Sequence, residues 1–163
     1  MRFPFLLLTV VAITLWTTTR HEFGHVLGAF LEGAEVTRVR ILPGVDPELG
    51  FYFGLVAYRG PTSWWTTAAP FLLAWLVAAL GSVWLFRATL SEGARRWGVL
   101  LLLISPLIDT TYGYLSGLWR PEADVFELRQ ALPELLVHVA FLLAIGVMTV
   151  AVRSLRTNPS ARR

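Results

Sequence analysis

The sequence predicts an all-α membrane protein: a bundle of about four transmembrane helices with a short β-hairpin in the first inter-helix loop. Charged residues make up 15% of the 163 residues, against about 25% in soluble domains, and mean hydropathy is +0.60. Four apolar segments reach the ~20 residues that a spanning helix needs. The loop after the first segment has the composition of a hairpin. We expect one membrane domain over residues 1–153 and a basic tail over 154–163.

The four predicted helices cover about 3–31, 64–86, 97–119 and 132–152. The first is interrupted only by Arg20, His21, Glu22 and His25. Prolines in or beside the other three are tolerated in membrane helices when neighbouring groups satisfy the freed carbonyl. A cleaved signal peptide is an alternative for the N-terminus, but its small-residue cleavage pattern is missing and apolar sequence resumes at Phe23. We therefore expect this segment to remain a helix.

A β-hairpin is expected at about 35–58, at the membrane surface. Residues 35–42 and 51–58 are rich in β-branched and aromatic residues, and residues 43–50 between them are rich in turn formers. The hairpin is either a simple connector or a functional element.

The charge pattern indicates an orientation and excludes several functions. All fourteen basic residues are arginine, and the predicted helices place eight of them on the side of both termini and five on the other. This bias favours both termini in the cytoplasm. No basic tract exceeds two residues, so we expect no nucleic-acid partner. There is no cysteine, so any metal must be bound by His, Asp or Glu.

The stretch His21-Glu-Phe-Gly-His25 carries the chemistry. Two histidines four residues apart point the same way on a helix, so both imidazoles can bind one ion. The glutamate between them can reach a water on that ion without being a ligand, which is the zinc-hydrolase arrangement. Thr14 and Thr18 share the histidine face, which should point into the bundle. The small Gly24 and Gly28 should let another helix approach closely. The alternative is a structural pair of packed histidines.

A catalytic zinc needs a third protein ligand. Asp109 is the first choice, because it is the only acid in the third predicted helix and its depth matches that of His21. Asp124 is the rival, just before the fourth helix at the end of the membrane that His25 approaches, although an N-cap would also explain it. Glu134 and His138, four residues apart, are expected to form an interfacial ion pair.

These residues resemble the membrane-embedded zinc metalloproteases of the site-2 protease type, especially their small bacterial members. The resemblance spans about residues 10–130 and rests on His21-Glu-Phe-Gly-His25 and the run that follows it to Ile41. Family members take a third ligand from an Asn…Pro…Leu-Asp-Gly pattern two membrane helices later. Ser105-Pro-Leu-Ile-Asp109 is similar but lacks the asparagine and the glycine. Divergent members carry a Ser-Asp-Ala element after that helix, which Glu122-Ala-Asp124 resembles.

The resemblance implies a zinc-dependent intramembrane endopeptidase of a bacterial cell membrane that cleaves membrane-associated proteins or peptides. It implies one Zn²⁺ on His21, His25 and Asp109, with Asp124 as the alternate third ligand. Glu22 would be the catalytic base that activates a zinc-bound water. It also suggests that the hairpin offers an edge to an unwound substrate segment. Two alternatives are a catalytically inactive metal-binding scaffold or regulator and a small ion-handling transporter.

Overall fold

A computed structural model describes residues 3–46 and 50–157 of the chain. The expected chain start at residues 1–2, part of the expected turn (47–49) and most of the expected tail (158–163) lie outside the described residues. The described elements are α1 (Phe3–Leu31), β1 (Glu35–Arg40), β2 (Gly44–Asp46), β3 (Gly50–Tyr52), β4 (Leu55–Arg59), α2 (Trp64–Arg87), α3 (Glu92–Val99), the π-helical segment η1 (Leu100–Ile104), α4 (Ser105–Ser116), α5 (Asp124–Ala131) and α6 (Glu134–Thr157).

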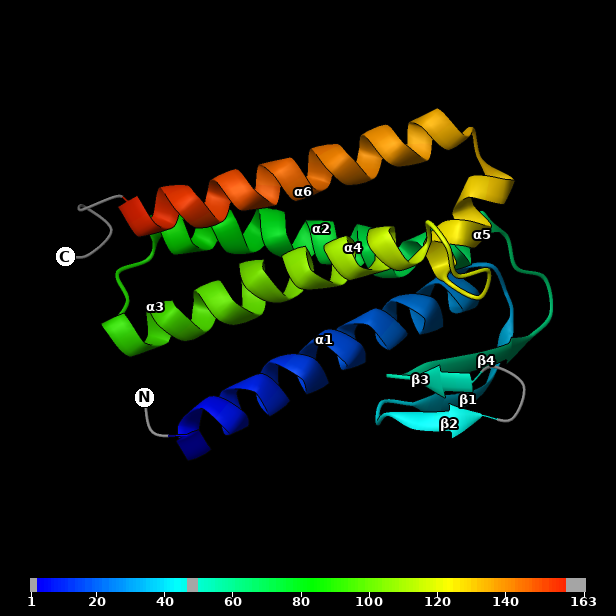
Figure 1. Cartoon of the computed structure of the whole chain (residues 1–163), viewed down its shortest axis with the longest axis horizontal. Helices are drawn as coiled ribbons and strands as arrows, with labels where there is room; N and C mark the ends of the chain where they lie inside the picture. Colours follow the sequence, from blue (N-terminus) through cyan, green and yellow to red (C-terminus); the bar gives the residue numbers. More distant parts are fainter. Residues whose placement is uncertain (1–2, 47–49, 158–163) are drawn as a thin grey trace.

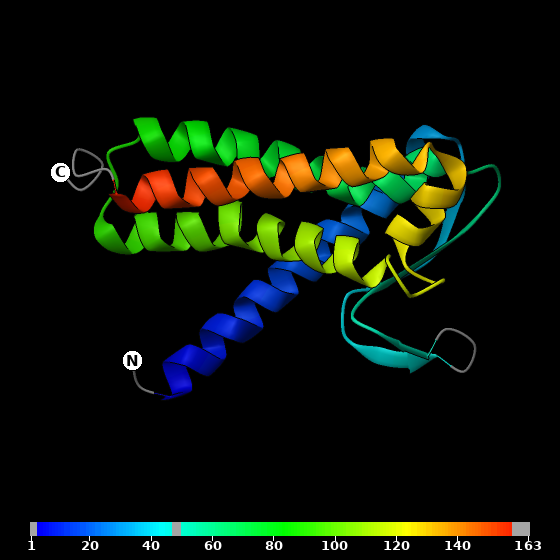
Figure 2. The ribbon, with the colours of Figure 1, turned by 45° about the horizontal axis from the view of Figure 1, so that its top comes forward.

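Long helices run side by side along the molecule, and the short elements gather at one end (Figure 1). Figure 2 shows that α2, α6 and the continuous run α3–η1–α4 form a bundle, while the N-terminal half of α1 diverges from it. The start of α1 and the end of α6 lie at the opposite end from α5 and the strands. Two apolar clusters form the core. One lies near α5 (Ala68, Phe71, Val125, Leu128, Val137 and Phe141) and the other nearer the end of α6 (Ala78, Leu85, Leu103, Met148, Val152 and Leu155).

Two glycines bring α1 against α2. A Cβ on Gly24 would lie 2.4 Å from the Pro70 Cα, and one on Gly28 would lie 2.8 Å from the Thr66 Cα. The two helix backbones therefore approach more closely than any side chain at these positions would permit. This is the close approach expected from the sequence, and it places the histidine turn of α1 directly on the first turns of α2.

The third long helix changes its hydrogen-bond register at η1, just before Pro106. The Ser105 N–H bonds to the Leu100 carbonyl, which is the five-residue spacing of a π-helix. At this spacing the Leu101 carbonyl would need the N–H of residue 106, which proline lacks. The indole Nε1 of Trp16 donates to that carbonyl at 2.9 Å instead. Pro106 thus leaves a carbonyl free to form a hydrogen bond between α1 and the bundle.

Three helical stretches within the described residues are long and apolar enough to cross a membrane: 64–87, 92–116 and 134–155. They match three of the four predicted spans, and α1 is not among them. Its apolar first half is followed by Arg20, His21, Glu22 and His25. The predicted third helix also shifts from 97–119 to 92–116.

The predicted hairpin forms two antiparallel strand pairs, one inside the other along the chain. In the outer pair, β1 runs antiparallel to β4 with Glu35 opposite Arg59, and a bulge interrupts the register between Val36 and Arg38. In the inner pair, β2 is antiparallel to β3 with Gly44 opposite Tyr52. Figure 1 shows these strands beside the C-terminal half of α1. The hairpin is thus positioned next to the histidine turn.

Helix α5 was not expected from the sequence, which predicted a loop before a helix at 132. It begins at Asp124, and its N-cap is Ala123. Asp124 is therefore not the N-cap of the last helix, which was the alternative explanation for this residue. The chain folds back sharply at Gly117, where a Cβ would lie 2.5 Å from the Val125 Cβ. This reversal carries Asp124 back to the end of α1.

Candidate metal centre

Helices α1 and α5 bring three potential metal ligands together. The Nε2 atoms of His21 and His25 lie 3.0 Å and 3.4 Å from the same Asp124 carboxylate oxygen, Oδ2. One donor atom from each of the three residues lies within 4.8 Å of the others. Two imidazole nitrogens and one carboxylate oxygen form the three-ligand set of catalytic zinc sites, which leave a fourth position open. The three residues could therefore hold a metal ion.

The outer nitrogen of each imidazole is also engaged. The Nδ1 of His21 lies 3.0 Å from Asp109 Oδ1, and the Nδ1 of His25 lies 3.2 Å from the Thr66 carbonyl oxygen. Carbonyl and carboxylate oxygens accept hydrogen bonds, so both Nδ1 atoms act as donors. Each Nε2 faces Asp124 Oδ2, so a metal ion bound between them would replace the Nε2 proton that this carboxylate otherwise accepts. Metal-binding histidines are oriented in this way by a carboxylate or carbonyl behind them.

Asp109 lies behind His21. Its second oxygen, Oδ2, accepts a hydrogen bond from Arg20 Nη2 at 2.9 Å, and both side chains are buried. The predicted first choice for the third ligand is thus engaged with the outer face of His21, and the grouped ligand atoms come from His21, His25 and Asp124. The reason is geometric: Asp109 approaches His21 from α4, whereas α5 carries Asp124 to the Nε2 side of both imidazoles.

Asp124 remains ionised over a wide range of pH. Burial alone would raise the pKa of this carboxyl group, but the electrostatic interaction with His25 and hydrogen bonds from His21 and His25 hold it well below its usual value. Its side chain keeps 26% of its surface exposed, against 12% for His25. The site is therefore open to solvent on the side of α5.

Glu22 lies under the hairpin. The residue is 6% exposed, and a Cβ on Gly54 would lie 2.4 Å from its Oε1 and 2.6 Å from the Thr18 Cγ2. Only a glycine fits between β3 and β4 at this point. Thr18 is buried and Thr14 is half-buried. The hairpin thus contacts the expected catalytic carboxylate through Gly54.

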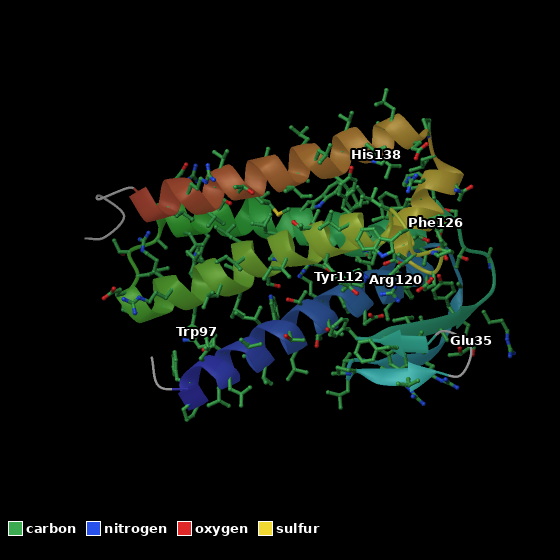
Figure 3. The ribbon with its side chains drawn as sticks, in the orientation of Figure 1. Glu35, Trp97, Tyr112, Arg120, Phe126 and His138 are labelled. Carbon is green, nitrogen blue, oxygen red and sulfur yellow. The ribbon has the colours of Figure 1, made fainter. Side chains whose placement is uncertain are left out.

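The other expected pair, Glu134 and His138, lies away from this centre. The His138 Nε2 is 3.5 Å from Glu134 Oε1, and its Nδ1 is 3.0 Å from the Tyr114 hydroxyl. Arg129 also pairs with Glu134. Figure 3 shows His138 on α6, apart from Tyr112 and Arg120 near the junction of α4 and α5. This pair ties α6 to α4 and α5.

Three contributors to the site escaped the sequence-based reasoning: Arg20, Thr66 and Gly54. Arg20 carried a usable signal, because a charge in an apolar helix beside a ligand motif needs a partner. Thr66 acts through its carbonyl, which stands four residues before Pro70 and so lacks a helical donor. Gly54 gave no signal, because its importance depends on how the hairpin folds onto α1.

Comparisons of the chain with protein families, curated proteins and solved structures find no match. What the site can do is therefore inferred from its own donor atoms and from the motif.

Proposed function

We propose that this chain is a zinc-dependent endopeptidase that cleaves membrane-associated proteins or peptides within or beside the bilayer. One observation supports this most strongly: two Nε2 atoms and a carboxylate oxygen converge while the Nδ1 of each imidazole is held by an acceptor. The metal ligands are then His21, His25 and Asp124. Asp109 orients His21 from behind rather than binding the ion.

The setting proposed for this site is a multi-pass membrane protein in which α1 is a fourth, partly polar, inserted helix. Three helices of the described chain have the length and hydropathy of membrane spans. The exposed surface of the first half of α1 is apolar, with Leu6, Leu7, Leu8 and Val10 between 50% and 68% exposed, as expected of a lipid-facing surface. Its ionisable residues lie at the end that packs on α2 and α4, as such residues do in membranes.

Bound zinc would polarise the scissile carbonyl and lower the pKa of a water molecule toward ~7. Glu22 would take a proton from that water while the water oxygen attacks the scissile carbonyl carbon. The C–N bond then breaks, and Glu22 would pass the proton to the leaving amine. Asp109 and the Thr66 carbonyl hold the imidazoles in the tautomer that this requires.

Replacing the base tests this proposal. Glu22→Gln should abolish cleavage of a membrane-inserted peptide library while the protein still binds one zinc ion. Proton transfer by a positioned group contributes about 10²–10⁴-fold in rate, so the loss should be at least of that order. Cleavage by the Glu22→Gln variant at the wild-type rate would reject the hydrolase assignment.

A second candidate is a metal-binding membrane scaffold without catalysis. The observation that favours it is the burial of Glu22, which is 6% exposed and packs against Gly54 of the hairpin. A full-length protein that binds zinc stoichiometrically but cleaves nothing in the same library would support this candidate instead.

A further inference from the structure

Pro70 lies beside the metal centre without contributing a ligand. It sits in the second turn of α2 and is fully buried. The Cα of Pro70 would be 2.4 Å, and its nitrogen 2.7 Å, from a Cβ placed on Gly24. Position 70 therefore packs against the α1 residue that precedes His25.

The proline ring changes the hydrogen bonding of α2 at one carbonyl. In a regular helix the Thr66 carbonyl would accept from the N–H of residue 70, and proline has none. Thr66 is fully buried, so its carbonyl cannot turn to bulk water, and a buried carbonyl without a partner is costly. The donor that it meets is the His25 Nδ1, 3.2 Å away.

This contact determines which ring nitrogen of His25 carries the proton. A carbonyl cannot donate, so the His25 Nδ1 must carry the proton and Nε2 is left to bind the ion. The same carbonyl also fixes the plane of the ring. An N–H at position 70 would compete for this carbonyl and weaken the hold on His25.

We propose that Pro70 is a positioning residue of the metal centre: by withholding a backbone N–H, it reserves the Thr66 carbonyl for His25. The inference deepens the proposed function and rests on zinc binding by His21, His25 and Asp124. It assigns to a helix proline a role in metal affinity that is separate from its effect on helix stability.

The test compares two replacements in the full-length protein in detergent. Pro70→Ala restores the N–H, whereas lactic acid incorporated at position 70 has the shape of alanine with an ester oxygen in place of that N–H. Zinc affinity is measured by competition with a chromophoric chelator, and the metal-free protein is melted in parallel. Groups that orient metal ligands from behind are worth about 10–100-fold in metal affinity.

We expect Pro70→Ala to bind zinc about tenfold more weakly than the wild type, with a metal-free melting temperature equal to or above that of the wild type. The lactic acid variant should keep an affinity close to the wild type. A purely structural role would instead lower stability and affinity together. Equal zinc affinity in Pro70→Ala and wild type, or equal losses in both variants, would overturn the inference.

Two further readouts separate the possible failures. A wild-type protein that binds no zinc refutes the proposed function itself, whereas normal wild-type binding with an unaffected Pro70→Ala refutes only the role of Pro70. If Pro70→Ala does not fold, ¹⁵N NMR of the zinc-loaded wild type decides. A protonated Nδ1 and a zinc-bound Nε2 at His25 support the inference, and the reverse assignment overturns it.

Discussion

Both histidines of the candidate centre use both ring nitrogens. The inner Nε2 atoms face Asp124, and the outer Nδ1 atoms are held by Asp109 and by the Thr66 carbonyl. A pair of merely packed histidines would need no such arrangement of four acceptor contacts. In the proposed metal centre the outer contacts would orient both imidazoles, because contacts of this kind fix the tautomer and raise ligand basicity.

The buried pair of Arg20 and Asp109 should be sensitive to loss of either charge. Arg20 Nε and Nη1 have no hydrogen-bond partner in the part of the chain that the structure describes, so Asp109 is its main compensation. Arg20→Gln leaves the carboxylate buried beside His21, which should lower the free energy of unfolding by about 3–5 kcal/mol. Denaturant unfolding of the metal-free protein measures this loss.

The matched control is Arg96→Gln, which breaks the exposed pair of Arg96 with Glu92. An exposed pair contributes about 0–1 kcal/mol. Similar losses in the two variants would mean that the Arg20–Asp109 pair is not buried as described.

Gly54 should be intolerant of any side chain. The added Cβ of Gly54→Ala would overlap Glu22 Oε1, 2.4 Å away, so either the carboxylate or the hairpin must move. Under the proposed function we expect peptide cleavage to fall by about tenfold or more, since small misplacements of catalytic groups cost up to ~10²-fold. Zinc affinity should stay unchanged, because Gly54 contacts no proposed ligand. Unchanged cleavage would show that Gly54 does not constrain Glu22 during catalysis.

Among the secondary-structure elements, the prolines of α2 and α4 explain contacts that a regular helix could not make. Pro70 leaves a carbonyl for His25, and Pro106 leaves one for Trp16. In both cases the freed carbonyl is taken by a side chain of α1. The two prolines therefore join the motif helix to the bundle at two depths.

The ionised carboxylate of Glu32, just after α1, accepts hydrogen bonds from residues at the start of α2. Hydrogen bonds from the Ser63 and Thr66 side chains and from the Ser63 N–H lower the pKa of Glu32 to about 2 from the usual 4.5. A depressed pKa in the folded state means that this contribution is complete above pH about 4.5 and is lost as the pH falls toward about 2.

Glu32→Gln should therefore lower the melting temperature at neutral pH and change it progressively less on acidification below pH about 4.5. Thermal unfolding of the two proteins across this range measures the difference. A gap between them that stays constant down to pH about 3 would contradict the assignment of the low pKa to Glu32.

The elements differ in how far the sequence predicted them. The bounds of α1 and α2 were predicted to within a residue, because long apolar runs define both helices. The start of the third helix at Glu92 was missed, because Arg95 and Arg96 end the continuous apolar run on which the prediction was based. Helix α5 was missed as well, because it is short and its packing depends on the reversal at Gly117.

The choice between the two aspartates could not be made from the sequence for the same reason. Asp109 matches His21 in depth along the bundle, and it does contact His21. Whether it meets Nδ1 or Nε2 depends on the rotation of α4, and the arrival of Asp124 depends on α5. Depth along a helix is readable from spacing, whereas the direction of approach depends on tertiary packing.

At the scale of the whole molecule, α5, which begins at Asp124, lies with the strands at one end of the helical bundle (Figure 1). The start of α1 and the end of α6 lie at the opposite end. In a membrane this arrangement would place the metal near one surface, reachable by water from the side of α5, where Asp124 is partly exposed.

Labelling of single cysteines tests the proposed insertion of α1, and the chain offers a clean background because it contains no cysteine. If α1 spans the bilayer, Pro4→Cys and Ser91→Cys should react with an impermeant maleimide from the same side. Gly60→Cys should react from the other side. Labelling of Pro4→Cys from the side of Gly60→Cys would show that α1 does not cross the membrane.

Zinc binding by four alanine variants tests the central claim most directly. In the full-length protein, His21→Ala, His25→Ala and Asp124→Ala should each lose stoichiometric zinc, because each removes one of three ligands. Asp109→Ala should still bind one ion, with an affinity about 10–100-fold weaker. Retention of wild-type affinity by Asp124→Ala, together with loss of zinc from Asp109→Ala, would contradict the assignment of the two aspartates.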